Sequence, residues 1–349
     1  GYLYTIAGWD VYIMEVVLSS AILVVFALIS MKGSGLSGNL QFIFCMFMAL
    51  VVSGLFVASF FSGEFALQNA EPLFNNEAGI WTSIILIVAI APWMYVGFDN
   101  IPQAAEEFKF SADKTFKLIV FGIIASILTY VAMILVTSWI YPDQNSMDGA
   151  VWVTGSVIQS SMGTVGMVFL AFAISFGIFT GLNGFYMSSS RLIFAMGRAN
   201  FVPAVFAKVH KKNKTPHYAV LFVLIVCLIA PWLGRTALSW IVDMSSVGVS
   251  VAFLATSAVS VKFFSAREHR NMVYVIFGGL GVIISLVFLV LLLFPGSPAA
   301  LTAPSYYALL AWTVLGLIFL AVKYKTLKSM TKEELDYMIL NKTREEAMH

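Results

Sequence analysis

The stretch PWMYVGFDNIPQ, at Pro92–Gln103, places a carboxylate, a tryptophan and two prolines directly after an uncharged apolar run. Pro92 removes one backbone donor and Gly97 weakens a helix, so we expect the helix to break between Pro92 and Asp99. Asp99 then suits the N-cap of a second helix that carries Pro102 in its first turn. Because an ionised side chain deep in a lipid bilayer is costly, Asp99 is expected to face a cavity or a partner.

Two half-helices joined by an unwound segment leave backbone carbonyls and amides without helical partners. Within a membrane this is tolerated only where the segment lines a cavity, and transporters build substrate sites in this way. The alternative interpretation is a proline-kinked helix in which Asp99 caps a helix end at the cytoplasmic interface. The residues of this stretch leave both interpretations open.

The composition determines which elements must hold this stretch. Hydrophobic residues make up 60% of the chain, charged residues 11%, and the mean hydropathy is +0.90, whereas soluble proteins have about 25% charged residues. The solvent is therefore expected to be lipid, and no run is typical of a strand. Nine runs approach the roughly 20 apolar residues of a membrane-spanning helix: Val11–Met31, Leu40–Phe61, Ile80–Glu106, Thr115–Tyr141, Gly163–Phe194, Tyr218–Leu233, Leu238–Phe264, Met272–Phe294 and Tyr306–Val322.

The positive charges predict the orientation of these helices. Of the 20 Lys and Arg residues, every one except Arg235 falls in alternate inter-helix loops or in the C-terminal tail. The basic side is predicted to be cytoplasmic, so the tail lies inside and the inner membrane is the expected location. An odd number of spans then places the first residue outside. Since the chain begins without Met, we expect a chain cut from a longer protein that has an odd number of further helices upstream.

Two other features bear on the function classes. The amphipathic stretch around AVWVTGSVIQSS, in a predicted outer loop, is interpreted either as a short helix lying flat over the outer mouth or as a surface loop. Cys45 and Cys227 lie inside apolar runs, where packed thiols are expected rather than a disulfide. The sequence contains no Cys/His cluster for a metal and no Gly-rich nucleotide loop, and its histidines lack a paired nucleophile. We therefore expect no metal, no cofactor, no nucleic acid partner and no enzymatic activity.

Three segments carry a family resemblance. WMYVGFDNIPQAAEEFKFSADKTFKLIVFGI resembles the sixth-helix signature of the amino acid–polyamine–organocation transporter superfamily. SSSRLIFAMGRANFVPAVFAKVHKKNKTPHYAV is similar to the connection between the family's eighth and ninth helices, and LISMKGSGLSGNLQFIF to the link between its fourth and fifth. Because the matches occur in family order and with family spacing, the chain is identified as a member that corresponds to the fourth to twelfth helices.

The resemblance implies an all-α membrane protein with the LeuT-like inverted-repeat fold, truncated at its N-terminus to nine spanning helices. The family's first helix, whose unwound segment forms half of the substrate site, would be missing. The chain alone is therefore expected not to transport, and the same chain with its upstream helices restored is expected to do so. The implied domains are a permease domain at 1–322, which comprises the rest of the first repeat at 11–61, the second repeat at 80–264 and two peripheral helices at 272–322, and a cytoplasmic tail at 323–349.

The resemblance also implies a substrate site. Trp93 matches a position that packs over the substrate's side chain, and Val96 and Gly97 match the unwound segment where the backbone meets the substrate. Phe185 matches an aromatic residue of the eighth helix that faces the pathway. We expect Trp93 and Phe185 to line one cavity. The alternative for both aromatic residues is simple packing.

Other residues match positions away from the substrate. Asp99 matches an acidic position of the inner gate or of proton coupling. Asp243, Ser245 and Ser246 match the outer vestibule, with an interfacial cap as the alternative for Asp243. Met48 lies about where some proton-coupled members carry a lysine, so coupling through such a lysine is not expected.

The function implied by the resemblance is secondary active transport of an amino acid or a related amine, such as a polyamine, by alternating access across a lipid bilayer. Whether a proton or a second amino acid is coupled, as in a symporter or an antiporter, is left open. Ser175 and Thr180 are interpreted either as sodium ligands or as hydroxyls that bond their own helix. A channel and a non-transporting sensor or scaffold are the alternative functions.

Overall fold

The computed structural model describes residues 1–71, 79–103, 112–140, 152–266, 270–331, 333–334 and 337, with backbone only at 34, 112–113 and 325–327. Three predicted segments lie partly or wholly outside these ranges: the end of the run that was predicted to reach Glu106, residues 141–151, and most of the predicted tail. The elements, in order, are β1 (Tyr2–Ile6), β2 (Trp9–Tyr12), α1 (Ile13–Lys32), α2 (Ser34–Ser59), η1 (Leu67–Ala70), α3 (Ile80–Met94), α4 (Asn100–Gln103), α5 (Ala112–Ile140), α6 (Val153–Arg198), η4 (Ala204–Ala207), α7 (His217–Cys227), η5 (Ala230–Leu233), α8 (Thr236–Ser265), α9 (Met272–Leu293) and α10 (Ala303–Ser329).

Seven helices of the described residues are long and apolar enough to cross a membrane, namely α1, α2, α5, α6, α8, α9 and α10. Two shorter apolar helices lie at Ile80–Met94 and at His217–Leu233. The nine predicted spans therefore correspond to seven helices of spanning length and two shorter ones. The two short ones contain Pro92 and Pro231, residues that interrupt regular helices.

Several predicted helix ends are wrong. The link after α1 is only Gly33, with φ +129°, and α2 begins at Ser34 instead of Leu40. A glycine reaches this φ without the steric cost that other residues meet, so one residue separates the two helices. The last helix continues past Val322 to Ser329. Cys45, predicted to be a packed thiol, is exposed on the apolar surface of α2.

The chain forms two compact units. The first consists of Gly1–Val17, Phe74–Val96 and Ile229–Tyr324, and the second of Leu18–Leu73, Gly97–Leu228 and Lys325–His349.

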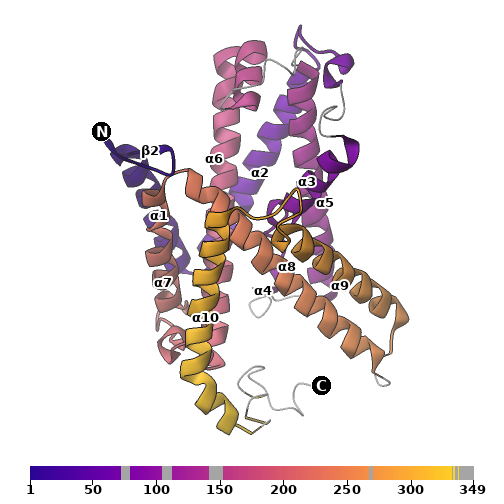
Figure 1. Ribbon diagram of the computed structural model, residues 1–349. Helices are drawn as coiled ribbons and strands as arrows, with labels where there is room; N and C mark the ends of the chain where they lie inside the picture. Colours follow the sequence, from indigo (N-terminus) through magenta and orange to yellow (C-terminus); the bar gives the residue numbers. More distant parts are fainter. Residues whose placement is uncertain are drawn as a thin grey trace. The chain divides into compact units, whose positions relative to one another are not determined.

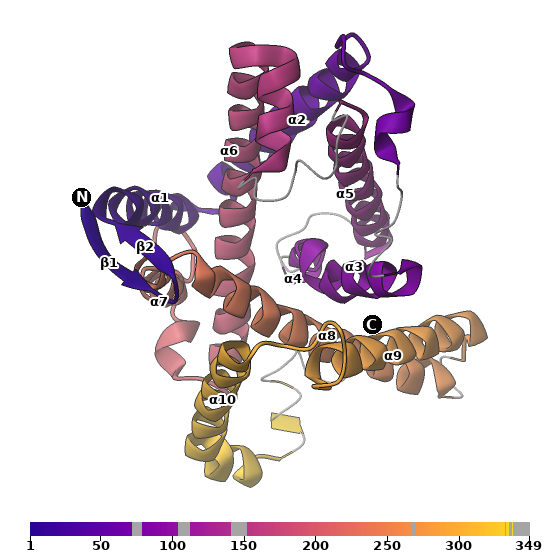
Figure 2. The ribbon, with the colours of Figure 1, turned by 45° about the horizontal axis from the view of Figure 1, so that its top comes forward.

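In the first unit, α8 and α9 run side by side as a hairpin of helices (Figures 1 and 2), and α3 contacts both. The helices approach closely at two glycines of α9. A Cβ added to Gly278 would lie 2.9 Å from Val261, and one added to Gly281 would lie 2.4 Å from the Oγ atom of Ser257. Val247, Leu292 and Leu301 form the buried core of this unit.

The first unit also contains a β-hairpin that the sequence analysis did not predict. β1 and β2 pair antiparallel, and both turn residues, Ala7 and Gly8, have positive φ. This is the turn geometry that two-residue hairpins favour. The hairpin packs on the start of α8, where the guanidinium of Arg235 lies 5.3 Å from the ring centre of Trp9 and Tyr4 donates a hydrogen bond to the carbonyl of Trp232.

The second unit is built on α2 and α6, with α5 packed against both. A second cluster joins α1, α6 and α7 through Phe26, Ala27, Tyr186 and Val220. The buried residues of the main cluster are Val51, Val52, Leu55, Val136, Ile140, Val157, Ile158, Leu170 and Ala173.

α6 bends sharply at Gly163, whose φ of +61° and ψ of −156° interrupt the helix. The segment from Val153 to Met162 folds back onto the following turn, as Figure 2 shows at the upper end of α6. A Cβ at Gly166 would lie 2.4 Å from the Cβ of Met162. The segment interpreted as a short helix or a loop is therefore helical from Val153 onward, and its placement over an outer mouth stays a prediction.

Candidate functional site

The predicted helix break is confirmed. α3 ends at Met94, turns follow at residues 95–99, and α4 begins at Asn100. Within the break the backbone bonds span three residues instead of four: the N–H of Val96 donates to Trp93 at 3.1 Å, and that of Asn100 to Gly97 at 3.1 Å. Pro92 lies inside the last part of α3, so the helix continues past the proline and breaks nearer the glycine.

The backbone of Gly97 makes the break possible. Its φ is +133°, in a region that residues with a side chain rarely adopt, and a Cβ added here would meet nothing within 4 Å. The backbone conformation alone, and not crowding, therefore requires glycine at this position. The boundary between the two units also falls here, between Val96 and Gly97.

Asp99 is half-buried. As the predicted N-cap it would accept a hydrogen bond from an N–H that follows it in the chain, but the bond in the structure comes from an N–H that precedes it. Its Oδ1 atom accepts a hydrogen bond from the N–H of Gly97 at 2.8 Å, so the carboxylate holds the preceding turn. The reason is local, because the turn at Gly97 brings that N–H within reach of the side chain two residues later. Among the described residues, no group of three or more His, Cys, Asp or Glu side chains is arranged to hold a metal ion.

The two predicted aromatic residues are both well exposed within their units. Trp93 lies in the last turn of α3 with 45% of its surface exposed, and Phe185 lies on α6 with 42% exposed. Neither side chain is part of a buried core, which favours a role other than packing inside its own unit. Trp93 belongs to the first unit and Phe185 to the second, and a shared cavity stays a prediction.

The predicted outer residues lie on α8. The Oδ2 atom of Asp243 accepts a hydrogen bond from the Oγ atom of Ser305 at 2.6 Å. Ser305 is fully buried in the first turn of α10, and its hydroxyl also contacts that of Thr302 at 2.8 Å. Asp243 therefore fastens α8 to the start of α10. Ser246 is buried and donates to the carbonyl of Val242. Ser245 is half-buried.

A buried polar network that was not predicted from the sequence joins α2 and α6. Asn183 and Ser37 are each 1% exposed. The Oγ of Ser37 donates to the Oδ1 of Asn183 at 2.7 Å. The Nδ2 of Asn183 donates to the carbonyl of Ser37 at 2.8 Å and to the Oε1 of Gln41 at 2.9 Å. The signal in the sequence is a lone amide in an apolar run, which normally needs a partner inside a membrane.

The second half of the broken helix approaches this network. α4 contacts α6, and a Cβ added to Gly184 would lie 3.4 Å from the Nδ2 atom of Asn100 and 4.0 Å from the Nε2 atom of Gln41. By contrast, the hydroxyls of Ser175 and Thr180 bond carbonyls of their own helix, at 2.7 Å each. The side chain of Asn183 therefore links α6 to α2, whereas the two hydroxyls do not link α6 to another helix through these bonds.

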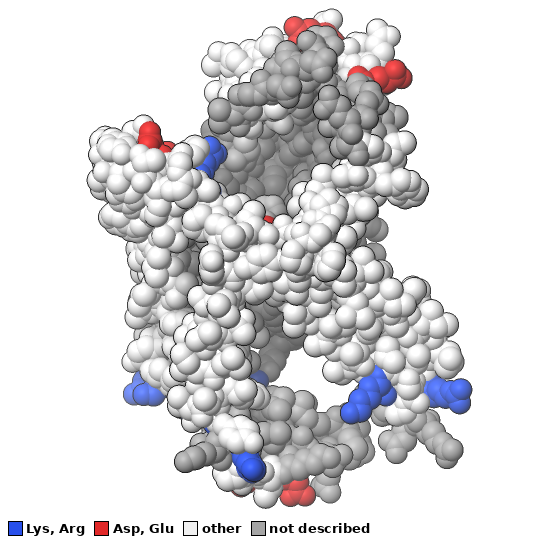
Figure 3. Space-filling view, viewed as in Figure 1, with Lys and Arg blue, Asp and Glu red and all other residues white. Residues whose placement is uncertain are grey.

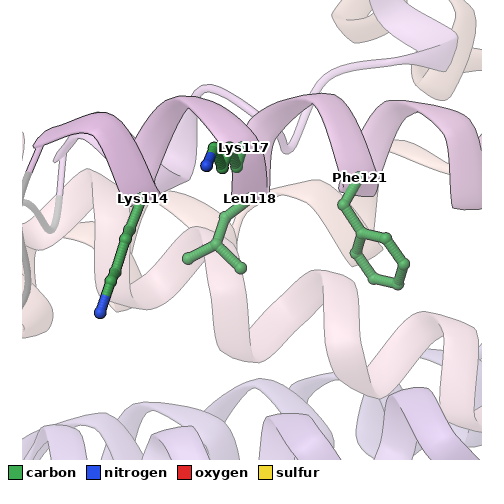
Figure 4. Close-up of a pocket in the computed structure, with 4 residues that line it drawn as sticks. All are labelled: Lys114, Lys117, Leu118 and Phe121. Carbon is green, nitrogen blue, oxygen red and sulfur yellow. The ribbon is translucent and has the colours of Figure 1, made fainter.

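A shallow hollow on α5 is lined by other residues. Its lining comes from one helix only, with Lys114, Lys117, Leu118 and Phe121 pointing outward (Figure 4). None of the predicted site residues lines it, so we do not assign the substrate to it.

The sequence of this chain is similar to those of known membrane transporters. A family model described as amino acid permease matches residues 1–319. The branched-chain amino acid permease BcaP of Lactococcus lactis is 22% identical over 58% of this chain and 42% of its own length. The BcaP of Bacillus subtilis is 30% identical over 38% of this chain and 29% of its own length. The methylthioribose transporter of Bacillus subtilis is 28% identical over 47% of this chain and 35% of its own length. The chain thus covers less than half the length of each of these relatives.

Proposed function

The chain belongs to the amino acid permease family, and on that premise we propose that it supports the movement of an amino acid across the membrane by alternating access. Its family and the seven apolar helices of spanning length among its described residues make it a multi-pass membrane protein. The observation that carries the proposal is the break at Gly97 inside an otherwise apolar helical run. Such a break takes backbone groups out of the regular helical pattern, and transporters of this class hold polar substrates at broken helices of this kind.

The break offers complementary chemistry to an amino acid. The C-terminal end of α3, at Met94, carries the negative end of the helix dipole and suits the substrate's ammonium group. Trp93, exposed in the last turn of the same helix, provides an aromatic surface for the substrate's side chain. We assign Val96 and Gly97 to the backbone contact, Phe185 to the transport pathway, and Asp99 to inner gating or proton coupling.

For the substrate, we propose an amino acid with a branched aliphatic side chain as the first candidate. Two of the relatives above carry that substrate in their names, and one is named for methylthioribose. An aromatic ring beside a helix end suits an apolar side chain attached to an ammonium group. Methylthioribose has no ammonium group that could interact with the helix dipole, and a polyamine has no branched aliphatic side chain.

The other assignments of the sequence analysis are proposals of the same kind. We place the protein in the inner membrane with its C-terminal tail in the cytoplasm, and the two repeats at 11–61 and 80–264. Asp243, Ser245 and Ser246 are proposed to border the outer vestibule. The hydrogen bond from Ser305 to Asp243 would then seal that region against the start of α10.

A thermal-shift screen of the purified protein tests the substrate class. The ligands are the twenty amino acids, common polyamines and methylthioribose. We expect leucine, isoleucine or valine to raise the unfolding midpoint most. A ligand at 100 times its dissociation constant stabilises the native state by about 2.7 kcal/mol. Stabilisation by methylthioribose or polyamines, with no amino acid effective, would contradict the proposal.

Replacing Trp93 with alanine is expected to weaken substrate binding by roughly 3- to 30-fold while the protein keeps its level in the membrane. The branched side chain would lose its apolar contact with the ring, which is worth about 0.7–2 kcal/mol for roughly 30–80 Å² of apolar surface removed from the solvent. Trp81 on the same helix, 78% exposed, is the matched control. Trp81→Ala should leave the dissociation constant unchanged, and equal losses in the two variants would show that Trp93 has no specific role.

A further inference from the structure

The connection between α6 and α7 is strongly basic. Lys208, Lys211, Lys212 and Lys214 are all exposed, and residues 199–216 contain no Asp or Glu. Lys32, at the last residue of α1, is exposed as well. All five lysines belong to the second unit. We refer to the four that lie between α6 and α7, namely Lys208, Lys211, Lys212 and Lys214, as the lysine turn.

The lysine turn is a built structure. The N–H of His210 donates to the carbonyl of Thr215 at 2.8 Å, and the N–H of Lys214 donates back to the carbonyl of His210 at 2.9 Å. These two bonds close the segment that carries Lys211 and Lys212 at its tip. Because the turn is closed in this way, its charges are presented together.

Two side chains tie the turn to the end of α1. The Nδ2 atom of Asn213 and the Oγ1 atom of Thr215 both donate to the carbonyl of Met31, at 3.0 and 2.9 Å. This brings Lys32 next to the turn. The basic side chains therefore collect where two apolar helices of spanning length, α1 and α6, end and where α7 begins. Figure 3 shows Lys and Arg side chains at the lower left, at the start of α7.

Apolar side chains lie exposed in the same connection. Phe201 is 38% exposed, Val205 38% and Val209 43%. A surface that binds a soluble anion has no use for exposed apolar side chains beside its lysines. A lipid interface accommodates both, because acyl chains begin where the headgroups end.

We propose that the lysine turn binds the phosphate headgroups of anionic phospholipids in the adjoining leaflet. Each lysine is a compact positive charge with three donors, which suits a headgroup phosphate. A basic residue close to an anionic membrane surface strengthens binding roughly fivefold. Lys211 and Lys212, at the tip, contribute most, and the bonds to Met31 hold Lys32 beside them.

The test measures lipid binding to the purified chain in a neutral detergent by microscale thermophoresis. The probes are dioctanoyl phosphatidylglycerol and dioctanoyl phosphatidylcholine. We expect the anionic lipid to bind at least tenfold more tightly than the zwitterionic one. The double variant Lys211→Gln, Lys212→Gln should lose on the order of 25-fold in affinity for the anionic lipid, about fivefold per lysine, and nothing for phosphatidylcholine.

The matched control neutralises another basic pair of the same unit, Lys114 and Lys117 on α5 (Figure 4). The control variant, Lys114→Gln with Lys117→Gln, should lose less than fivefold. Equal affinities for the two lipids, equal losses in the two double variants, or competition by inorganic phosphate at the same concentration as the lipid would each overturn the proposal. The thermal shift produced by the amino acid should not change in the Lys211, Lys212 variant, so this proposal and the transport proposal fail separately.

Discussion

Replacing Gly97 with alanine is expected to lower amino acid uptake by roughly 10- to 100-fold while the protein remains folded in the membrane. The φ of +133° at Gly97 lies where a side chain is strained, and the site offers open space around an added Cβ. The penalty therefore comes from the backbone, at about 1–3 kcal/mol, and each 1.4 kcal/mol corresponds to a factor of ten. We expect the variant to favour a more regular helix in which the turn at Gly97 is lost.

Gly122 on α5 is the control for this substitution. It lies in a regular stretch of helix, and an added Cβ there would also meet nothing within 4 Å. Gly122→Ala is expected to keep uptake unchanged and to raise stability by up to about 1 kcal/mol, because alanine is the better helix former. Initial rates per molecule, with membrane levels measured by immunoblot, check both results. Equal rates for the two variants would remove the special role of Gly97.

Replacing Asn183 with leucine is expected to lower the free energy of unfolding by about 2 kcal/mol. The buried amide makes three hydrogen bonds to α2, through Ser37 and Gln41. Hydrogen bonds between helices in membranes average about 0.6 kcal/mol each, so the loss of three accounts for this figure. The variant leaves the hydroxyl of Ser37 and the amide of Gln41 without these partners. Denaturant unfolding in detergent micelles measures the effect.

Two comparisons separate this network from a general effect of mutating α6. Ser175 lies on the same helix, but its hydroxyl bonds only its own backbone, at Ala171. Ser175→Ala should therefore cost less than about 0.5 kcal/mol. A double-mutant cycle of Asn183→Leu with Gln41→Leu should be non-additive, since the two side chains share one bond. Strict additivity, or an equal cost for Ser175→Ala, would contradict the network.

The parts of the site that could be predicted from the sequence are those determined locally. A broken helix could be predicted from Pro92 and Gly97, because each residue changes the backbone at its own position. The apolar run before them indicated the helix that is broken. The direction of the Asp99 bond could not be predicted in this way. It depends on the turn that Gly97 makes, and both an N-cap and a backward bond satisfy a carboxylate.

Features that depend on tertiary contacts could not be predicted. Asn183 was overlooked because its partners, Ser37 and Gln41, lie about 140 residues away. The N-terminal hairpin was overlooked because YLYTI is apolar and short, and only the turn at Ala7 and Gly8 marks it. The predicted gap between Met31 and Leu40 contains several serines and glycines, residues that are typical of loops, so the single-residue link at Gly33 could not be predicted. In each case the deciding contact or φ value is absent from the local pattern.

Counterflow in proteoliposomes tests the central claim most directly, that the broken helix at Gly97 belongs to an amino acid transporter. The vesicles would contain the product of the gene that encodes this chain and would be loaded with the amino acid that gives the largest thermal shift. The account predicts transient, saturable accumulation of the radiolabelled amino acid, which is abolished by excess unlabelled amino acid outside and strongly reduced by Gly97→Ala but not by Gly122→Ala. A flux that rises linearly with concentration, or accumulation equal in wild type and Gly97→Ala, would contradict it.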